Sequence, residues 1–207
     1  LTDVIALQIM PICISNIQQC WATRNRMYIL NQFYPMIFAN IIILLLGSFI
    51  LVRLNPALLM PIIGILIILQ AVFSRIPFFN INNSSKIPLV IIISGILSGI
   101  LGSISSFYAF PSVQVLVATR LKRDEFIFIV GFFLSTGFIA LWIGILVNGF
   151  PIIKMLPLSL ILTLPSILGM SLGNIIRENL NSKWFYTMVQ IMLIMTGTLL
   201  IGKSLIF

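Results

Sequence analysis

Long apolar runs, separated by short polar stretches, make up nearly the whole chain. A spanning α-helix needs about 20 apolar residues, whereas a transmembrane β-strand alternates in polarity over about ten. The runs here are long and do not alternate, which favours helices. Six segments qualify or nearly qualify as spans: Asp3–Trp21, Phe33–Val52, Pro56–Ser74, Glu125–Val147, Ile153–Ile176 and Trp184–Gly202. The pattern predicts an all-α polytopic membrane protein, with residues 1–207 in a single transmembrane domain.

A seventh apolar region, Pro88–Thr119, is too long for one untilted span and is interrupted internally. Its first part carries Gly95, Gly99 and Gly102, a spacing that lets a neighbouring helix approach closely. Its centre is rich in serine and ends at Pro111, which removes a backbone donor. We therefore expect helical arms joined by an irregular segment.

Composition excludes a water-soluble protein. Hydrophobic residues make up 60% of the chain and charged residues only 8%, with a formal net charge of +8. A soluble surface needs far more charge than this. The Lys and Arg residues lie in short connections, where they set the orientation of a membrane protein. We therefore expect the lipid bilayer as a partner, and no nucleic acid.

A weak internal repeat accompanies the spans. The matching pairs, 121, 122 or 128 positions apart, are Asp3 with Asp124, Ser15 with Thr136, Trp21 with Trp142, Pro35 with Pro157, Gly47 with Gly169 and Arg75 with Lys203. They predict a first repeat over about residues 1–77 and a second over about 86–207, each with three spans. Because Pro88–Thr119 precedes only the second set of spans, we expect about 35–45 further residues before Leu1.

The twelve Lys and Arg residues predict how Pro88–Thr119 lies in the membrane. If the region returns to the side that it enters, nine of them lie on that side and three on the other. A single crossing divides them six and six, which the positive-inside rule disfavours. The nine are Arg24, Arg26, Arg75, Lys86, Arg120, Lys122, Arg123, Arg177 and Lys183, and the three are Arg53, Lys154 and Lys203. We expect a broken re-entrant hairpin entered from the cytoplasm, and two inverted three-helix repeats.

Polar residues within the apolar segments are the candidates for a binding site. A helix that breaks at membrane depth presents free backbone N–H groups, which favour an anion, and neighbouring hydroxyls add neutral hydrogen bonds. The candidates in the hairpin are Gly99, Gly102, Ser103, Ser105, Ser106, Tyr108, Pro111 and Gln114. Simple helix packing is the alternative explanation for the glycines and serines.

The first span carries a second polar cluster: Pro11, Ser15, Asn16, Gln18 and Gln19. Amide side chains in a bilayer must find partners or water, so we expect this cluster to face the interior. Ser135 and Thr136 lie at the repeat-related positions of the second half. The substrate-binding candidates outside the hairpin are therefore Ser15, Asn16, Gln19, Ser135 and Thr136, with interhelical hydrogen bonding as the alternative.

The sequence gives no sign of an enzyme, a metal site or a cofactor. The chain has no His, no pair of carboxylates within a span and no Cys–His or Ser–His arrangement. Cys13 and Cys20 lie about 10 Å apart along one helix, too far for a disulfide, and we expect both to be apolar fillers. Asp124 and Glu125 lie at a helix start, where capping and the helix dipole explain them.

Three parts of the chain resemble the TauE/SafE family of sulfite exporters and organic anion permeases. They are Leu7–Gln19, then Ser94–Gly102 with Pro111 and Arg120–Phe126, and finally Gly169–Phe185 with Thr196 and Gly197. The resemblance implies two homologous halves, each opened by a Gly-rich segment, and export of small sulfur-containing or carboxylate anions. Two features depart from it: Ser103–Phe107 stands where adjacent glycines are usual, and the first Gly-rich segment is absent.

The sequence thus predicts a transporter that exports a small anion, such as sulfite, a sulfonate or a related carboxylate, through a midplane site. A non-transporting scaffold or assembly subunit, and a neutral-pore anion channel, are the alternatives. We expect a multi-pass protein of the prokaryotic inner (plasma) membrane. The sequence leaves open whether it forms a homo-oligomer. A monovalent anion gains about 2.3 kcal/mol per 100 mV by leaving an inside-negative cell, so uncoupled export is physically sufficient. The alternatives are a coupling ion held by hydroxyls and carbonyls, or a coupling group in the segment expected before Leu1.

Overall fold

The computed structural model describes residues 2–53, 56–73, 87–119, 121–179 and 182–206. All regular elements in these ranges are helices, and no residue in them forms a strand. The α-helices are α1 (Thr2–Ala22), α2 (Leu30–Leu51), α3 (Pro56–Phe73), α4 (Ile87–Ser105), α5 (Ser112–Ala118), α6 (Arg123–Val147), α7 (Leu156–Asn179) and α8 (Ser182–Ile206). Two 3-10 turns, η1 (Arg24–Ile29) and η2 (Ile152–Met155), precede α2 and α7. The predicted all-α fold is confirmed.

Four stretches of the described chain are long and apolar enough to cross a membrane: Arg24–Leu51, Pro88–Ser105, Asp124–Val147 and Ile152–Gly169. The apolar stretches of α3 and α8 are shorter, at Leu59–Val72 and Gln190–Ser204. α1 has 21 residues, but several amide and hydroxyl side chains lower its apolarity. The predicted spans that correspond to α1, α3 and α8 are therefore not among these four.

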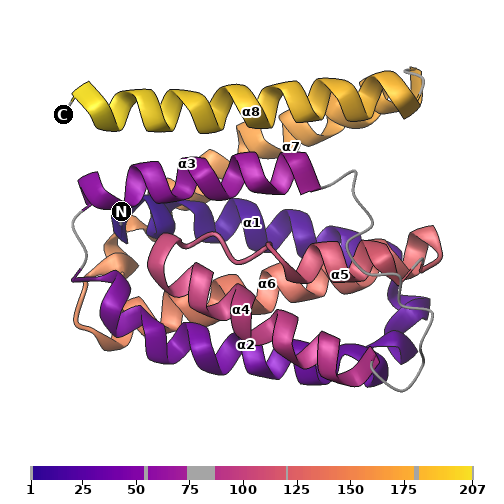
Figure 1. Cartoon of the computed structure of the whole chain (residues 1–207), viewed down its shortest axis with the longest axis horizontal. Coiled ribbons are helices and arrows are strands. Elements are labelled where there is room, and N and C mark those ends of the chain that lie inside the picture. Colours follow the sequence, from indigo (N-terminus) through magenta and orange to yellow (C-terminus); the bar gives the residue numbers. More distant parts are fainter. Residues whose placement is uncertain (1, 54–55, 74–86, 120, 180–181, 207) are drawn as a thin grey trace.

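Helices from the first half of the chain pack against helices from the second half. α1 packs against α6 and α7, α2 packs against α4 and α6, and α3 packs against α8. α1 and α6 run in opposite directions, as do α3 and α8 (Figure 1). Phe33, Leu44, Phe133 and Leu141 are fully buried between these helices. Lipid is as apolar as these side chains, so van der Waals packing is the main force holding the helices together.

Glycines bring the backbones of α2 and α4 together. A β-carbon at Gly95 would lie 2.4 Å from the carbonyl oxygen of Met36, and one at Gly99 would lie 2.6 Å from Cβ of Ile43. Real β-carbons do not approach other atoms so closely, so only glycine allows this contact. The predicted role of the glycine spacing in close helix packing is confirmed, and the neighbouring helix is α2.

α3 and α8 form a separate outer pair that meets at two facing glycines. A β-carbon at Gly64 would lie 2.7 Å from the carbonyl oxygen of Gly197, and one at Gly197 would lie 2.8 Å from that of Gly64. Gln190 Nε2 also donates a 3.1 Å hydrogen bond to the carbonyl of Ala71. This pair covers one side of the bundle (Figure 1).

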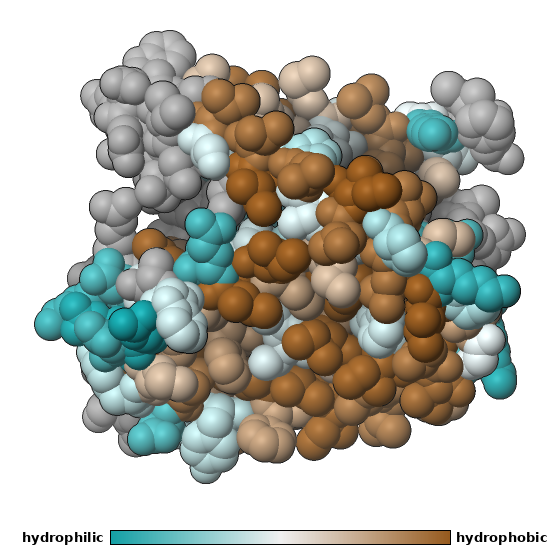
Figure 2. Space-filling view, turned by 180° about the vertical axis from the view of Figure 1, so that it is seen from behind, coloured by the Kyte–Doolittle hydropathy of each residue, from teal (hydrophilic) through white to brown (hydrophobic). Residues whose placement is uncertain are grey.

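Large apolar side chains cover the outside of the bundle as well as its interior. The exposed fractions are 62% for Phe38, 66% for Leu164 and 68% for Leu199. On the face in Figure 2, apolar residues fill the middle and hydrophilic residues gather toward the two ends. Such a surface is stable in lipid rather than in water, so the bundle is an integral membrane domain.

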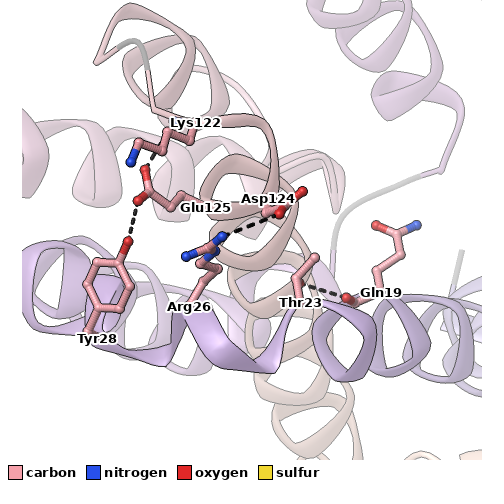
Figure 3. A network of polar contacts seen from close by, with 7 residues as sticks. All are labelled: Gln19, Thr23, Arg26, Tyr28, Lys122, Asp124 and Glu125. Atoms are coloured by element: carbon pink, nitrogen blue, oxygen red, sulfur yellow. Dashed lines mark hydrogen bonds and ion pairs between the residues drawn. The ribbon is translucent and has the colours of Figure 1, made fainter.

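A polar network fastens the start of α6 to η1 (Figure 3). The Lys122 backbone N–H donates a 3.0 Å hydrogen bond to Glu125 Oε2, and the Tyr28 hydroxyl donates to Glu125 Oε1. Arg26 pairs with Asp124 at 3.6 Å. The Glu125 carboxylate thus closes an N-terminal cap and lies at the positive end of the helix dipole. The capping role predicted for the two carboxylates is confirmed for Glu125, and Asp124 forms the exposed ion pair.

Basic residues lie at both ends of the bundle. Arg24, Arg26 and Lys122 lie where α1 ends and α6 begins, whereas Arg53, Lys154 and Lys203 lie at the opposite end. Asn148 Nδ2 donates a 3.4 Å hydrogen bond to Ser48 Oγ, which joins the ends of α6 and α2 there. Arg75, Lys86 and Arg120 lie outside the described residues, as do the side chains of Arg123, Arg177 and Lys183.

Candidate substrate site at the turn between α4 and α5

The predicted break in the region Pro88–Thr119 is present. α4 is continuous through Ser105, and Ser106 then adopts a left-handed backbone conformation with φ 59°. A non-glycine residue in this conformation costs on the order of 1–3 kcal/mol and persists only where its surroundings fix it. The irregular turn Ser106–Pro111 follows, and the chain becomes helical again at Ser112.

After the turn, the chain folds back along α4. Ser98 Oγ donates a 2.8 Å hydrogen bond to Ser112 Oγ and accepts a 3.0 Å hydrogen bond from the Ser112 backbone N–H. Ser98 lies roughly 17 Å along α4 from its start, at 1.5 Å per residue, so α5 begins beside the middle of α4. The chain enters α4 and leaves α5 at the same end of the bundle (Figure 1).

Tyr108 docks the turn onto the middle of α6. Its hydroxyl donates a 2.6 Å hydrogen bond to the carbonyl of Leu134, and its ring lies 6.1 Å from that of Phe133. A β-carbon at Gly137 would lie 2.5 Å from Cε2 of Tyr108. The absence of a side chain at Gly137 therefore makes the seat for the tyrosine ring. Gly102 serves the same purpose on α4, since its β-carbon would lie 2.6 Å from Cβ of Tyr108.

α2 completes the site with Asn40, a residue that the sequence reasoning missed. Asn40 Oδ1 lies 3.0 Å from the position of a β-carbon at Gly137, so the amide and the Tyr108 ring flank the same glycine. Asn40 is 1% exposed, and neither its Nδ2 nor its Oδ1 has a hydrogen-bond partner. The signal in the sequence is an amide side chain within an otherwise apolar span, the same pattern that makes Asn16 a candidate.

The predicted serine hydroxyls in the hairpin donate to backbone carbonyls. Ser103 Oγ lies 2.7 Å from the carbonyl of Gly99 and 3.0 Å from that of Ile43 on α2. Ser105 Oγ donates to the carbonyl of Leu101 at 2.7 Å and accepts a 3.2 Å hydrogen bond from the Phe107 N–H. These hydroxyls therefore hold the hairpin in its present conformation.

Backbone N–H groups at the start of α5 are also partnered within the hairpin. Besides the Ser112 N–H, the Val113 N–H donates to the carbonyl of Ala109 at 2.9 Å, and the Val115 N–H donates to that of Pro111 at 3.1 Å. Gln114 is buried in the same turn of helix. At the start of this seven-residue helix, the N–H groups of Ser112, Val113 and Val115 are thus occupied, and the Pro111 carbonyl is one of the acceptors.

The polar cluster of α1 lies against an earlier part of α6, around Gly131. A β-carbon at Gly131 would lie 3.5 Å from the carbonyl oxygen of Asn16 and 3.9 Å from Cβ of Gln19. Asn16 is buried and Gln19 is half-buried, but Gln18 is exposed on the outside of the bundle. The expectation that the whole cluster faces the interior is wrong for Gln18, because the helical period turns it away from α6.

Ser15, Ser135 and Thr136 each donate to a carbonyl of their own helix. The acceptors are the carbonyls of Ile12 at 3.1 Å, of Gly131 at 2.8 Å and of Phe132 at 2.9 Å, respectively. Ser135 is adjacent in sequence to Leu134, the acceptor of the Tyr108 hydroxyl. α6 therefore contacts both sets of predicted binding residues. The turn lies against Leu134–Gly137, and the α1 cluster lies against Gly131, about one helical turn earlier.

Across the described ranges, no group of three or more His, Cys, Asp or Glu side chains lies close enough together to hold a metal ion. Cys20 Sγ donates a 3.6 Å hydrogen bond to the carbonyl of Phe128, and Cys13 is a half-buried free thiol. The polar groups at the turn are neutral amide and hydroxyl groups. They can form hydrogen bonds with a small solute, but they offer no acid–base or nucleophilic arrangement.

Irregular backbone inside an apolar helical bundle, with neutral polar side chains around it, is found in membrane transport proteins. Comparison with family models supports this class. Residues 1–200 match the family described as sulfite exporter TauE/SafE, and the chain belongs to this family, as its sequence predicted. The family consists of transporters rather than enzymes. Comparisons with curated proteins and with solved structures gave no match.

Proposed function

We propose that the protein exports a small anion, such as sulfite, a sulfonate or a related carboxylate, from the cytoplasm of a prokaryotic cell across its inner membrane. The observation that carries the proposal is the docking of Tyr108, within the irregular turn, on the middle of α6. Irregular backbone at membrane depth is stable only where protein or a water-filled cavity satisfies it. In transport proteins, such breaks lie beside the solute.

The distribution of charge supports an anion as the solute. The chain has four acidic residues against twelve basic ones, and three of the four, Asp3, Asp124 and Glu125, lie in the first turns of α1 and α6. No carboxylate therefore lies in the middle of these helices to repel an anion. A monovalent anion gains about 2.3 kcal/mol per 100 mV by leaving an inside-negative cell, so export proceeds without a coupling ion.

The helix contacts support an inverted repeat of α1–α3 and α6–α8. The first helices of the two repeats pack together, as do the third helices, α3 and α8. Each first helix also packs against the second helix of the other repeat, α1 on α7 and α6 on α2. A two-fold axis in the membrane plane produces such a set of contacts. In this arrangement α4 and α5 form a re-entrant hairpin, and the end with Arg24, Arg26 and Lys122 faces the cytoplasm.

One observation favours a second candidate function, a non-transporting scaffold. The serine hydroxyls of the hairpin donate to carbonyls, so they already have a structural use. A scaffold needs this rigidity and no solute. The two candidates differ in whether a polar side chain at the turn is required for flux.

The test is efflux of radiolabelled sulfite and of a small radiolabelled sulfonate from cells that express the full chain. Ser105→Leu places an apolar side chain at the turn, and we expect it to abolish efflux while the protein still reaches the membrane. Ser105→Ala is tested beside it, because it removes the hydroxyl without adding volume to a buried position.

Ser166→Leu is the matched control. Ser166 Oγ donates a 3.0 Å hydrogen bond to the carbonyl four residues earlier, as Ser105 does, but it lies on the exposed face of α7. We expect its efflux to equal that of the wild type. Full efflux in both Ser105 variants would remove the hairpin from the transport pathway. No efflux from the wild type, with the protein confirmed in the membrane, would favour the scaffold.

A further inference from the structure

The Asn40 side chain is buried at the centre of α2 without a hydrogen-bond partner. An asparagine amide offers two N–H donors and a carbonyl acceptor. Among the described residues with buried unpaired side-chain atoms, only Asn40 has both a donor and an acceptor unpaired. Buried polar atoms are nearly always partnered in folded proteins, because an unpaired one keeps the cost of leaving water with nothing gained.

Two other amides of the bundle, Asn148 and Gln190, have partners. Asn148 Nδ2 donates to the carbonyl of Gly144 at 2.7 Å, and Gln190 Nε2 donates to that of Ala71. Leu162 on α7, 122 positions after Asn40, is the repeat-related residue. A second helix of this repeat therefore forms with leucine at the equivalent place. The amide of Asn40 is not a requirement of helix formation.

The surroundings of the amide place it at the point where three parts of the bundle meet. Asn40 Oδ1 and Cε2 of Tyr108 both lie within 3.0 Å of the position of a β-carbon at Gly137. On the other side, the backbone carbonyl of Asn40 lies 3.3 Å from the position of a β-carbon at Gly99 on α4. The amide thus lies where α2, α6 and the turn meet, and the backbone of the same residue faces α4.

We infer that the Asn40 amide is a direct ligand of the transported anion, and this inference rests on the proposed export function. Nδ2 donates a hydrogen bond to a bare oxygen of the anion, and Oδ1 accepts one from a hydroxyl beside it. The substrate class that matches both atoms is a small oxyanion with a hydroxyl next to a bare oxygen, such as hydrogensulfite. Asn40 supplies these contacts without introducing a charge.

Access to the amide depends on the turn. Tyr108 and the Asn40 amide lie side by side at Gly137 in this structure, and the turn Ser106–Pro111 that carries Tyr108 is not helical. The tyrosine is attached to α6 through one hydrogen bond, to the carbonyl of Leu134. The solute reaches Asn40 when Tyr108 leaves the seat at Gly137, and the return of the ring closes the site.

The inference is tested with the purified full chain, alone and reconstituted into vesicles. Asn40→Leu replaces the amide by an apolar side chain of similar size, and Asn40→Ala avoids any excess volume. Asn31→Leu is the matched control, because Asn31 is an exposed asparagine in the first turn of the same helix. Sulfite flux and the sulfite-induced rise in melting temperature are measured for each, under mildly acidic conditions in which hydrogensulfite is present.

We expect both Asn40 variants to lose at least tenfold in flux and to lose the sulfite-induced rise. Without sulfite, we expect Asn40→Leu to melt at or above the temperature of the wild type, because it removes the unpaired atoms. Flux within twofold of the wild type in both variants would overturn the inference and leave export intact. Such flux, combined with a lower melting temperature of the two variants, would identify the Asn40 amide as a structural group that binds water. A wild type that moves no anion would overturn the export function itself.

Methanesulfonate tests whether Asn40 Oδ1 accepts a hydrogen bond from a hydroxyl of the anion. It presents bare oxygens and no hydroxyl, so it leaves Oδ1 unpaired. We expect it to raise the melting temperature of the wild type less than hydrogensulfite does, and Asn40→Leu to remove the difference. Equal rises in the wild type would overturn the proposed preference for an anion with a hydroxyl.

Discussion

The hydroxyl of Tyr108 donates a 2.6 Å hydrogen bond to the carbonyl of Leu134 and thereby joins the irregular turn to the centre of α6. The donor lies in the turn between α4 and α5, and the acceptor lies in α6. This bond, together with the Gly137 seat, fixes the position of the turn against the helices that surround Asn40.

Tyr108→Phe should loosen the turn without changing the shape of the ring. The variant removes one buried hydrogen bond, which corresponds to a loss of about 1 kcal/mol in the free energy of unfolding. The measurement is the melting temperature of the purified protein, with sulfite efflux as a second readout. Tyr34→Phe is the control, because Tyr34 is 57% exposed on α2 and should not respond. Equal melting temperatures for Tyr108→Phe and the wild type would show that this hydrogen bond does not stabilise the protein.

Gly47→Ala and Gly169→Ala should have different effects, although the two glycines are matched in the predicted repeat. A β-carbon at Gly47 would lie 2.1 Å from Cβ of Ser103, whereas one at Gly169 would meet nothing within 4 Å. We expect Gly47→Ala to destabilise the α2–α4 contact by about 1–3 kcal/mol, as overpacking does. Gly169→Ala should be neutral or stabilise by up to about 1 kcal/mol, because alanine favours a helix. Unfolding in mixed detergent measures both, and a neutral Gly47→Ala would contradict the close contact.

Single cysteines at the two ends should be labelled from opposite sides of the membrane. In a background with Cys13→Ala and Cys20→Ala, we expect a membrane-impermeant thiol reagent to reach Arg24→Cys and Lys122→Cys from the cytoplasmic side. Arg53→Cys and Lys154→Cys should react from the other side. The pairing of Arg24 with Lys122 is decisive, because α2, α3 and the hairpin lie between them. Labelling of these two from opposite sides would mean that the region Pro88–Thr119 crosses the membrane once.

Glu125→Ala and Asp124→Ala should differ in their effect on stability. The Glu125 carboxylate accepts hydrogen bonds from the Lys122 N–H and from Tyr28, so its replacement weakens the cap of α6 and lowers the melting temperature. Asp124 forms one ion pair at 3.6 Å with a half-exposed side chain, and such pairs contribute little. The control is the same pair of variants in high salt, which should leave only the Glu125 effect. Equal losses for both variants would contradict the capping role.

The break between α4 and α5 could be predicted because proline, glycine and serine change the local backbone whatever surrounds them. The glycine spacing likewise predicted a close helix contact, since the lack of a β-carbon is a property of the residue itself. The use of the serine hydroxyls could not be predicted. Whether Ser103 or Ser105 donates to a solute or to a carbonyl depends on which acceptors the folded chain leaves within reach. Ser103 lies within reach of one carbonyl of α2 and one of its own helix, whereas Ser105 donates to a carbonyl of its own helix.

The missing partner of the Asn40 amide is a second feature that could not be predicted from the sequence. The position of Asn40 in an apolar span indicated a buried amide, as for Asn16, but nothing in the local sequence distinguishes a partnered amide from an unpartnered one. Gly137 lies 97 positions later in the chain and Tyr108 lies 68 positions later. Only the packing of α2, α6 and the turn brings the three residues together.

The sequence by itself determined that this protein lies in lipid, that it is helical and to which family it belongs. Runs of about 20 apolar residues must be helical in lipid, because each backbone N–H and C=O then finds its partner within the helix. The tertiary structure decided which helices are neighbours, because lipid gives no hydrophobic preference for one apolar face over another. The pairing of α3 with α8 and the seat of Tyr108 on α6 therefore depend on shape, and above all on where glycine leaves room.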